Sequence, residues 1–458
     1  MGWAAENLLM NTETKKDFDI VIVGLGKTGY AGACFFANQN TRIAVTDSRQ
    51  NPPALESIQK TLPDVPLYLG KIDGELLMNA GELLVSPGVS LREPVISAAI
   101  QSGVKVYGDV EAFCQRISKP VIAITGSNGK STVTTLITEM VNAAGLNAAM
   151  GGNIGTPVLD LLTKEQPDYY VLELSSFQLE TVSSLNAVAS VVLNISQDHM
   201  ERYSSLADYS QIKSRIYAGD GTMVINLDDP LVANMINVDR KTIGFTLRNP
   251  DSGQYGLATC NGKQWLVKAE EKLMPVENLR IPGKHNISNA LAALALADAI
   301  NLPRDAALNV LEKFSGLPHR CQWIATIRGV DWYNDSKGTN VAASCAAITG
   351  LSSKENIILI AGGDSKGADF SDLVHAARGR VREAIVIGRD GHLVKSALQD
   401  HINVYTAESM ESAVNKASEI TTPGDLVLLS PACASTDMFV DYQARGNAFV
   451  SAVERLRG

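Results

Sequence analysis

Short apolar runs alternate with amphipathic segments along most of this chain, and small or polar residues follow the runs. The first example is Ile20–Val23, followed by the glycine-rich Gly24–Gly29 and the segment Ala31–Asn38. A second run, Arg42–Thr46, ends in Asp47. Apolar runs of this length between turn signals are typical of buried parallel strands, and the intervening segments are typical of helices. The pattern predicts an α/β protein.

A second unit repeats the pattern. The run Val121–Ile124 leads into a Gly-rich turn and then into Val133–Met140, whose apolar spacing favours a helix. Further strands are predicted at Tyr169–Leu174 and Ala189–Asn194. Polar residues follow these buried strands, so we expect a ligand site at the carboxyl edge of a parallel sheet.

Residues 221–282 have a different pattern, in which short strand-like runs are separated by turn residues. Asn261-Gly262 is a strong hairpin signal. We predict a small antiparallel layer here, followed by an alanine-rich helix at 287–300. The strand-like runs are 222–226, 241–245, 255–259 and 264–268.

Alternation of strand and helix resumes near Leu317. Polar, small-residue loops follow three of the strands, at 334–340, 362–366 and 430–435, and we expect them to form a second substrate surface. The predicted strands are 330–333, 357–360, 384–387, 404–405 and 426–429, and the predicted helices include 342–348 and 442–455.

The complete pattern predicts three domains at 1–108, 109–316 and 317–458. The first and third are expected to be Rossmann-like. The second is expected to be a phosphate-binding parallel sheet with the small antiparallel layer.

Composition narrows the class of protein. The chain has 45% apolar and 19% charged residues, which is ordinary for a globular protein, and a net charge of -9. An acidic balance argues against nucleic-acid binding. Six scattered cysteines without a C-x-x-C pair fit a reducing compartment. The sequence has neither a signal peptide nor an apolar span long enough for a bilayer, so we expect a cytoplasmic protein without a membrane span. We also expect a monomer.

The turn after Val121–Ile124 has the composition of a phosphate-binding loop. Its glycines allow backbone N–H groups to converge on phosphate oxygens, Lys130 adds a positive charge, and Ser131 adds a hydroxyl for magnesium. The likeness is incomplete, because Ile124 stands where the usual spacing has a glycine. The predicted ligand is the triphosphate of ATP, and the alternative is a turn that only caps a helix.

The first glycine-rich turn is a G-x-G-x-x-G fingerprint, with Asp47 near the offset that reaches a ribose or a base. A dinucleotide site is the default inference, but the strands end by about Gly108 and leave room for one mononucleotide-binding half. Another nucleotide diphosphate is therefore favoured over NAD, and a structural turn remains open. Ser86-Pro87-Gly88 either borders the same crevice or is an ordinary turn.

Three residues at strand ends are candidates for chemistry near the phosphate loop, namely Glu173, Asp198 and His199. A glutamate within an apolar strand is costly to bury unpaired, and a magnesium ion would remove that cost.

These motifs together resemble the Mur ligases. The resemblance runs from about Asp19 to the C-terminus, and the motifs occur in the order typical of that family. They are Gly126–Thr132, Gly152–Gly155, Glu173–Gln178, Asp198–Met200, His285-Asn286, Leu317–Arg320 and Asn334–Lys337.

The resemblance implies a reaction in which ATP, UDP-N-acetylmuramoyl-L-alanine and D-glutamate give an amide, ADP and phosphate. A carboxylate does not acylate an amine at a useful rate, so ATP would first convert it to an acyl phosphate. Such an enzyme mainly positions the reactants and neutralises charge.

The resemblance also implies catalytic and metal-binding roles. Lys130 would contact the transferred phosphate, Ser131 and Glu173 would serve one Mg²⁺, and His199 would serve a second, supported by a carbamoylated Lys213. From the residues alone, Lys213 is expected to be a solvated helix lysine, and His199 is as readily a structural residue.

Binding residues are implied in the same way. Those for ATP are Gly126, Ser127, Asn128, Gly129, Lys130, Ser131, Thr132, Asn286, Asn289, Arg320 and Asp335. Those for the UDP substrate are Thr28, Asp47, Ser48, Arg49, Ser86, Asn153, Ser175 and Gln178. Those for D-glutamate are Lys337, Thr339, Lys366, Ser435, Thr436 and Tyr442.

Some positions depart from the family pattern, and other functions remain open. Thr436 and Tyr442 stand where Leu and Phe are expected, and Lys27 stands where Leu is expected. The alternatives are another Mur ligase or a folylpolyglutamate-type ligase, and a nicotinamide-dependent oxidoreductase that would use the Gly24 fingerprint.

Overall fold

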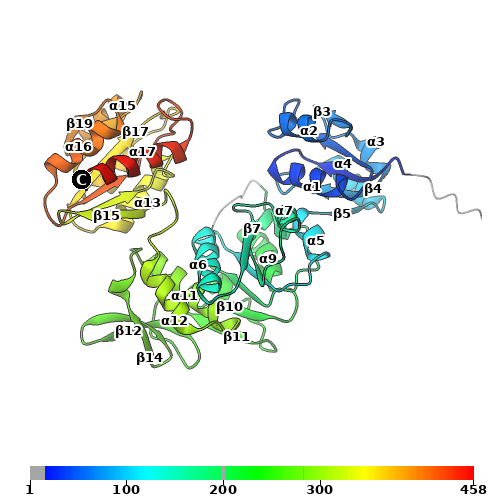
Figure 1. The fold of residues 1–458 in the computed structure, drawn as a ribbon, viewed down its shortest axis with the longest axis horizontal. Helices are drawn as coiled ribbons and strands as arrows, with labels where there is room; N and C mark the ends of the chain where they lie inside the picture. Colours follow the sequence, from blue (N-terminus) through cyan, green and yellow to red (C-terminus); the bar gives the residue numbers. More distant parts are fainter. Residues whose placement is uncertain (1–15, 197–201, 282, 458) are drawn as a thin grey trace, which may run out of the picture. The chain divides into compact units, whose positions relative to one another are not determined.

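The computed structural model describes residues 16–196, 202–281 and 283–457. Strand and helix alternate along the chain (Figure 1), which confirms the predicted α/β class. The chain divides into two compact units. The first contains residues up to 130, 146–225 and 229–242, and the second contains 131–145, 226–228 and the chain from 243 onward. None of the described helices combines the length and apolar character that crossing a bilayer requires.

The first unit begins with a parallel sheet in which β1 lies between β2 and β4. The chain leaves β1 for β2 on one side and later returns to β4 on the other, so the carboxyl ends of β1 and β4 border a topological switch point. The order is β3-β2-β1-β4-β5, with β1 (Phe18–Val23), β2 (Ile43–Asp47), β3 (Leu67–Leu69), β4 (Ala80–Val85) and β5 (Lys105–Tyr107).

Helices connect these strands, and the first of them starts directly after the Gly24 turn. They are α1 (Lys27–Ala37), α2 (Leu55–Thr61), α3 (Gly74–Met78), α4 (Pro94–Gln101) and, on the way to the next sheet, α5 (Asp109–Cys114). The apolar faces of α3 and α4 bury Leu76, Leu77 and Ile96 in the same core as Val21 and Val23 of β1.

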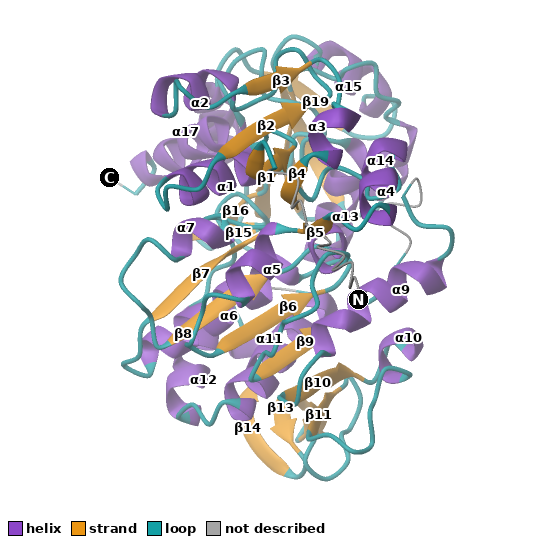
Figure 2. Cartoon of the chain, turned by 90° about the vertical axis from the view of Figure 1, so that its right-hand side faces the viewer, coloured by secondary structure: helices purple, strands orange, loops and turns teal. Residues whose placement is uncertain are grey.

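The first unit also contains the five parallel strands of the central sheet, in the order β10-β9-β6-β8-β7 (Figure 2). They are β6 (Val121–Thr125), β7 (Ala148–Gly152), β8 (Tyr169–Glu173), β9 (Ala189–Val192) and β10 (Thr222–Asn226). Of the helices between them along the chain, α7 (Val158–Leu161), α8 (Ser176–Leu179) and α9 (Leu206–Ser214) belong to this unit.

Two of the runs assigned to the antiparallel layer pair in parallel instead. Residues 222–226 were predicted to belong to the antiparallel layer, but they form β10, which pairs parallel with β9. All five residues of β10 are buried, as in a strand covered on both faces. This run therefore belongs to the parallel core.

The antiparallel layer is confirmed in the second unit for the runs 255–259 and 264–268, whereas the run 241–245 pairs in parallel. Strands β12, β13 and β14 form an antiparallel ribbon, and β11 joins β12 through one parallel pair. Asn261 (φ 51°) and Gly262 (φ 76°) are the whole turn between Cys260 and Lys263, as expected for a two-residue hairpin with both central residues at positive φ. The elements are β11 (Thr242–Phe245), β12 (Tyr255–Cys260), β13 (Lys263–Lys268) and β14 (Glu271–Pro275).

The second unit ends in a six-stranded sheet of order β15-β16-β20-β17-β18-β19, parallel except for β15. Residues of β17 alternate between two cores, one on each face of the sheet. The carboxyl ends of β16, β20 and β17 are neighbours, as the three polar loops predicted. The strands are β15 (Gln322–Ile327), β16 (Val330–Asn334), β17 (Ile357–Gly362), β18 (Val381–Ile387), β19 (Asn403–Thr406) and β20 (Leu426–Leu429).

In the second unit, helices alternate with many of the strands along the chain. Helix α6 (Lys130–Ala143) continues from the phosphate loop, and α11 (Lys284–Ala299) is the predicted alanine-rich helix. Further helices of this unit include α13 (Val341–Leu351) and α17 (Tyr442–Arg455).

Candidate active site

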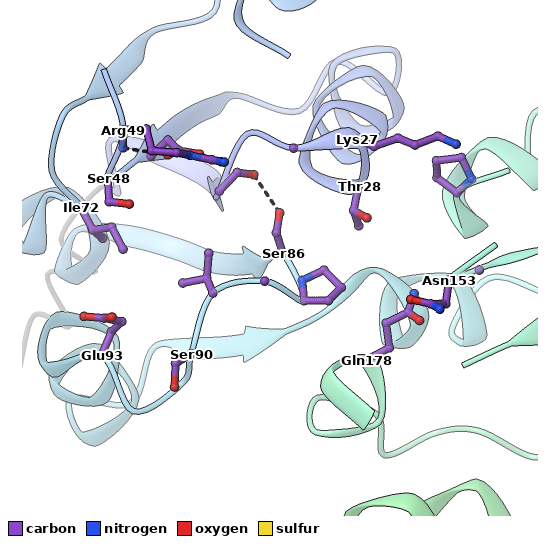
Figure 3. Close-up of a pocket in the computed structure, with 18 of the residues that line it drawn as sticks. Lys27, Thr28, Ser48, Arg49, Ile72, Ser86, Ser90, Glu93, Asn153 and Gln178 are labelled. Carbon is purple, nitrogen blue, oxygen red and sulfur yellow. Dashed lines mark hydrogen bonds and ion pairs between the residues drawn. The ribbon is translucent and has the colours of Figure 1, made fainter. Parts of the chain in front are cut away.

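A cavity of about 920 Å³ lies at the carboxyl ends of β1, β2 and β4 (Figure 3). Loops that follow these strands form one wall. The other wall is formed by the end of β7, the loop after it and Gln178 of α8. Seven of the eight residues predicted for the UDP substrate line it, namely Thr28, Asp47, Ser48, Arg49, Ser86, Asn153 and Gln178. The eighth, Ser175, caps α8, and its hydroxyl accepts from the backbone N of Gln178 at 3.2 Å. Most of the residues predicted for the UDP substrate therefore lie at the topological switch point of the first sheet.

The glycine-rich turn is packed tightly against the start of α1. Gly24 has φ +93°, and the Ser86 hydroxyl donates to its carbonyl at 2.8 Å. A Cβ on Gly29 would lie 1.9 Å from the same carbonyl, so only glycine fits there. The N-terminus of α1, with its unpaired N–H groups, therefore opens onto the cavity as a site for negative charge.

Asp47 is engaged by the protein itself. One carboxylate oxygen accepts from the backbone N of Arg49 at 2.9 Å and from its Nε at 2.8 Å. The other accepts from Leu25 N and Arg49 Nη2, both at 2.7 Å. Burial disfavours the charged form, but these donors outweigh it and lower the pKa of Asp47. With both oxygens occupied, Asp47 is poorly placed to accept from a ribose as a dinucleotide site requires.

The motifs did not identify eight of the lining residues as ligand contacts, namely Lys27, Ile72, Val89, Ser90, Glu93, Pro94, Val95 and Pro157. Lys27, noted only as a departure from the family pattern, donates to the Gly155 carbonyl at 2.5 Å and so joins the two walls. Ile72, Ser90 and Glu93 lie in loops or before a helix. No spacing or composition in the sequence distinguishes them.

The phosphate loop follows β6, next to the end of β9. Gly126 (φ 149°) and Gly129 (φ 84°) take up backbone angles that favour glycine. Ser127 N donates to the Asn194 carbonyl at 2.9 Å, and Asn128 N donates to the Asn194 side chain at 2.8 Å. These hydrogen bonds to Asn194, just after β9, hold the loop in place although Ile124 stands where the usual motif has a glycine.

Two lysines lie against this loop. Lys130 Nζ donates to the carbonyls of Gly126 at 2.9 Å and Ser127 at 3.0 Å. Lys213 Nζ, on α9, donates to Thr125 Oγ1 at 3.2 Å and to the Gly126 carbonyl at 3.1 Å, and it lies 4.7 Å from the centre of the Tyr209 ring. Lys213 is only 1% exposed. The expectation of a solvated lysine, drawn from the residue alone, is therefore wrong.

Glu173 lies beside the loop at the end of β8, opposite Ile124 of β6. It is 2% exposed, and Asn153 Nδ2 donates to its Oε1 at 2.7 Å. Its Oε2 is buried and has no hydrogen-bond partner among the described residues. A buried carboxylate oxygen in this state is costly unless a cation meets it, so Glu173 fits the predicted magnesium ligand.

The other predicted metal ligands are placed less fully. Ser131 is in the first turn of α6, in the second unit, and His199 lies outside the described residues. Asp198, the other strand-end candidate, also lies outside them. Within 16–196, 202–281 and 283–457, no group of three or more His, Cys, Asp or Glu side chains is arranged to hold a metal ion.

In the second unit, the residues predicted for ATP lie on α11 and near the start of the last sheet. Asn289 Nδ2 donates to Asn286 Oδ1 at 3.3 Å, so the two amides are on one face of the helix. Asp335 follows β16, accepts from Ser430 Oγ at 2.7 Å and from Cys321 N at 3.1 Å, and burial raises its pKa to about 6. Arg320 precedes β15.

The residues predicted for D-glutamate lie on the loops after β16, β17 and β20 and at the start of α17. Lys337 Nζ is 4.1 Å from the centre of the Tyr442 ring, so tyrosine supplies the aromatic face expected of phenylalanine. The remaining positions are Thr339, Lys366, Ser435 and Thr436.

Arg445, which the sequence analysis missed, connects two of these loops. It is 1% exposed and donates to Ser336 Oγ at 3.0 Å, the Ser336 carbonyl at 2.9 Å and the Cys433 carbonyl at 3.1 Å. Burial lowers its pKa to about 10. An arginine one turn into a terminal helix carries no sequence signal of this role.

Three family models match consecutive parts of the chain. Residues 18–108 match the "Mur ligase MurD-like, N-terminal domain", 124–297 the "Mur ligase middle domain" and 319–433 the "Mur ligase, glutamate ligase domain".

Similar proteins extend over almost the whole chain. The UDP-N-acetylmuramoylalanine–D-glutamate ligase of Nitrosococcus oceani is 52% identical over 95% of this chain and 96% of its own length. The protein of the same name from Hahella chejuensis is 48% identical over 96% of this chain and 99% of its own.

Solved structures share the fold at lower identity. UDP-N-acetylmuramate-alanine ligase from Thermotoga maritima superposes with a TM-score of 0.56 at 18% identity and covers 96% of this chain and 99% of its own. A UDP-N-acetylmuramoyl-L-alanyl-D-glutamate–2,6-diaminopimelate ligase reaches 0.59 at 18% identity, with 96% and 92% covered.

Proposed function

The chain belongs to the Mur ligase family, and we propose that it catalyses the ATP-dependent addition of D-glutamate to UDP-N-acetylmuramoyl-L-alanine. The observation that carries this proposal is the 52% identity to a ligase of that name over 95% of the chain. The products are the extended peptide precursor, ADP and phosphate. We assign the UDP substrate to domain 1–108, ATP to 109–316, and D-glutamate with part of ATP to 317–458.

The cavity at the switch point is our proposed site for the UDP substrate. The open N-terminus of α1 suits the diphosphate, because its N–H groups and helix dipole favour negative charge. Thr28, Ser48, Arg49 and Ser86 offer polar contacts on one wall, and Asn153 and Gln178 offer amides on the other. Asp47 would act by holding Leu25 N and Arg49 in place.

The loop Gly126–Thr132 is our proposed site for the ATP phosphates. Lys130 would exchange its two contacts with loop carbonyls for phosphate oxygens. Asn286, Asn289, Arg320 and Asp335 are proposed for the adenine, the ribose and the terminal phosphates.

Magnesium is the cofactor we propose, at two sites. Glu173, with its unpartnered Oε2, and Ser131 would hold the first ion, and His199 with Lys213 would hold the second. Bound magnesium neutralises the charge of the phosphate oxygens.

We propose that Lys213 is carbamoylated. In this step the neutral amine forms an N–C bond with carbon dioxide and releases one proton, leaving N–H and a carboxylate. The nitrogen keeps one hydrogen, so one of the bonds to Thr125 Oγ1 or the Gly126 carbonyl can persist. The product places a carboxylate beside the Gly126 carbonyl, to which both Lys130 and Lys213 donate.

The chemistry then needs positioning and charge neutralisation. The alanyl carboxylate takes the terminal phosphate of ATP to form an acyl phosphate, and the D-glutamate amine attacks its carbonyl and expels phosphate. Lys337 and Lys366 suit a substrate with two carboxylates. Thr339, Ser435, Thr436 and Tyr442 complete the proposed amino-acid site.

We further propose that the enzyme acts as a cytoplasmic monomer. The six cysteines are all free thiols, which supports a reducing compartment.

The test is an assay of phosphate release that depends on D-glutamate, with L-glutamate and diaminopimelate as controls. We expect release only with ATP, UDP-N-acetylmuramoyl-L-alanine and D-glutamate together. Equal release with diaminopimelate would favour another ligase of the family. Tight NADH binding that UDP does not displace would contradict the assignment of the first cavity.

A further inference from the structure

The proposed UDP site has two walls from different parts of the first unit. The loops Gly24–Thr28 and Ser86–Ser90 form one wall, and Gly152, Asn153 and Gln178 contribute to the other (Figure 3). A ligand that contacts both walls is bound well only when their separation is correct, because hydrogen bonds weaken steeply with distance. The groups that connect the walls therefore bear on affinity.

Arg202 makes such a connection from outside the cavity. Its Nε donates to Glu180 Oε1 at 2.9 Å and its Nη2 to Glu180 Oε2 at 2.5 Å, which is a two-pronged ion pair. Its Nη1 also donates to the Pro87 carbonyl at 3.0 Å, and its Nη2 donates to the Val89 carbonyl at 3.2 Å. The guanidinium carbon lies 4.3 Å from the centre of the Phe177 ring.

The contacts of Arg202 are close to the cavity on both sides. Pro87 and Val89 line one wall, and Glu180 is two residues after Gln178, at the C-terminal cap of α8. Arg202 itself is not among the lining residues. The side chains of Arg202 and Glu180 are 12% and 13% exposed, so solvent screens the pair little.

We propose that Arg202 is a positioning residue that sets the separation of the two cavity walls, and so the affinity for the UDP-linked substrate. The proposal rests on the proposed function of this cavity. The planar guanidinium is required because it directs N–H groups toward the carboxylate and the two carbonyls at once. A lysine at this position has the charge but only one nitrogen, so it cannot hold both sides in the same way.

Arg92 offers a matched control nearby. It donates to the Arg202 carbonyl at 3.2 Å and to Asp208 at 3.4 Å, but its side chain is 67% exposed. It does not line the 920 Å³ cavity. The exposed Arg92–Asp208 ion pair is expected to contribute little free energy to the structure.

The experiment compares Arg202→Met, Arg202→Lys and Arg92→Met in steady-state kinetics. We expect both Arg202 variants to raise the KM for UDP-N-acetylmuramoyl-L-alanine about tenfold or more, since bonds to charged groups are lost. The kcat at saturation and the KM for D-glutamate should change by less than about threefold. The reason is that Arg202 contacts Glu180, Pro87 and Val89, none of which is proposed to bind ATP or D-glutamate. Arg92→Met should match the wild type.

Several outcomes would overturn the proposal. Full rescue by Arg202→Lys would mean that only charge matters, and an unchanged KM in both variants would mean that the walls do not depend on this contact. Melting temperatures are recorded for all variants and for Glu180→Gln, and unfolding of every one would assign the pair to stability alone.

Calorimetric titration of UDP into wild type and Arg202→Lys tests the cavity without turnover. Weaker UDP binding by the variant supports the positioning role even if the wild type shows no D-glutamate-dependent phosphate release. Absence of that release alone contradicts the proposed reaction. Equal UDP affinity in the two proteins contradicts the role of Arg202.

Discussion

Two lysines approach one carbonyl oxygen beside the phosphate loop. Lys130 and Lys213 donate to the Gly126 carbonyl at 2.9 and 3.1 Å. Lys213 is almost fully buried, so its Nζ is held at the loop. Phosphate oxygens would accept from Lys130, and a carbamate on Lys213 would place a carboxylate at the loop for a metal ion. The same geometry thus supports both proposed roles.

The first prediction concerns Lys130. Replacing Lys130 by Ala should lower the rate of phosphate release by about a hundredfold or more, because a charge aimed at the transferred phosphate is lost. The affinity for UDP, measured by calorimetry, should be unchanged. The exposed Lys164 gives a control, and Lys164→Ala should behave as wild type. Near-normal turnover of the Lys130 variant would make the loop a structural turn.

Lys213 gives a second prediction with a chemical readout. Lys213→Ala should be inactive, because both the carbamate and its support of the metal are removed. Short carboxylates such as acetate or propionate should partly restore phosphate release by entering the space left behind. The same acids should not restore Lys130→Ala. A fully active Lys213 variant would contradict the carbamate.

Asp109 is a buried acid behind the cavity wall, and it yields a prediction about pH. Gln178 Nε2 donates to its Oδ2 at 3.3 Å, and Oδ1 has no partner among the residues described. Burial, the largest influence, raises its pKa from 3.8 to about 6. The folded protein therefore holds a proton between these pH values that the unfolded chain has lost. The stability from this group is complete below pH 3.8 and disappears as the pH rises through about 6.

Asp109→Asn keeps the neutral shape and should remove this dependence. At pH 8 the variant should be more stable than wild type by up to roughly 3 kcal/mol, at 1.4 kcal/mol per pKa unit. The difference should shrink toward zero near pH 4. Thermal unfolding of both proteins across this range measures it, with the exposed Asp239→Asn as control. A difference that does not vary with pH would refute the assignment.

The site residues divide into those that a local motif identifies and those that it does not. Asp47 and Gln178 belong to short patterns whose chemistry depends on neighbours in sequence, so they were predicted. Arg202 contacts Pro87 and Val89, more than a hundred residues earlier. Arg445 likewise connects loops that are distant along the chain. Such contacts depend on which strands become neighbours, and one sequence does not contain that information.

At the scale of elements, burial decided which strands were predicted. Long apolar runs such as those of β1, β6 and β17 are buried throughout or nearly so and were found. Strands β3 and β5 have three residues each and are partly exposed, so their apolar runs are too short to indicate a strand. The run of β10 was found but was given the wrong partner, because a fully apolar run does not specify its pairing.

The turn between β12 and β13 supplies a prediction at this scale. A Cβ on Gly262 would meet nothing within 4 Å, so only its positive φ opposes a side chain. Gly262→Val should destabilise the hairpin by about 1–2 kcal/mol, and Gly262→Asn by less, because asparagine tolerates this region. Hydrogen exchange of amides in 255–268 measures the loss. Equal protection in the Val variant and wild type would contradict the turn assignment.

At the scale of the molecule, the proposed reactants are assigned to two compact units. The UDP cavity and Lys130 belong to the first unit, and Lys337, Lys366 and Ser435 belong to the second. Amide formation needs the acyl phosphate and the amine within about 3.5 Å. Catalysis therefore requires loops of the second unit to lie at the first when the reactants are bound.

We predict that ligands make the whole molecule more compact. Small-angle scattering should give a smaller radius of gyration when UDP-N-acetylmuramoyl-L-alanine and a non-hydrolysable ATP analogue are both present, because closure is driven by contacts made in both units. UDP alone occupies only the first unit and should leave the radius unchanged, which is the matched control. Lys130→Ala should close less with the same ligands, since its phosphate contact is missing. Identical scattering in all states would show that the units are already fixed in the reactive arrangement, and catalysis would then need no closure.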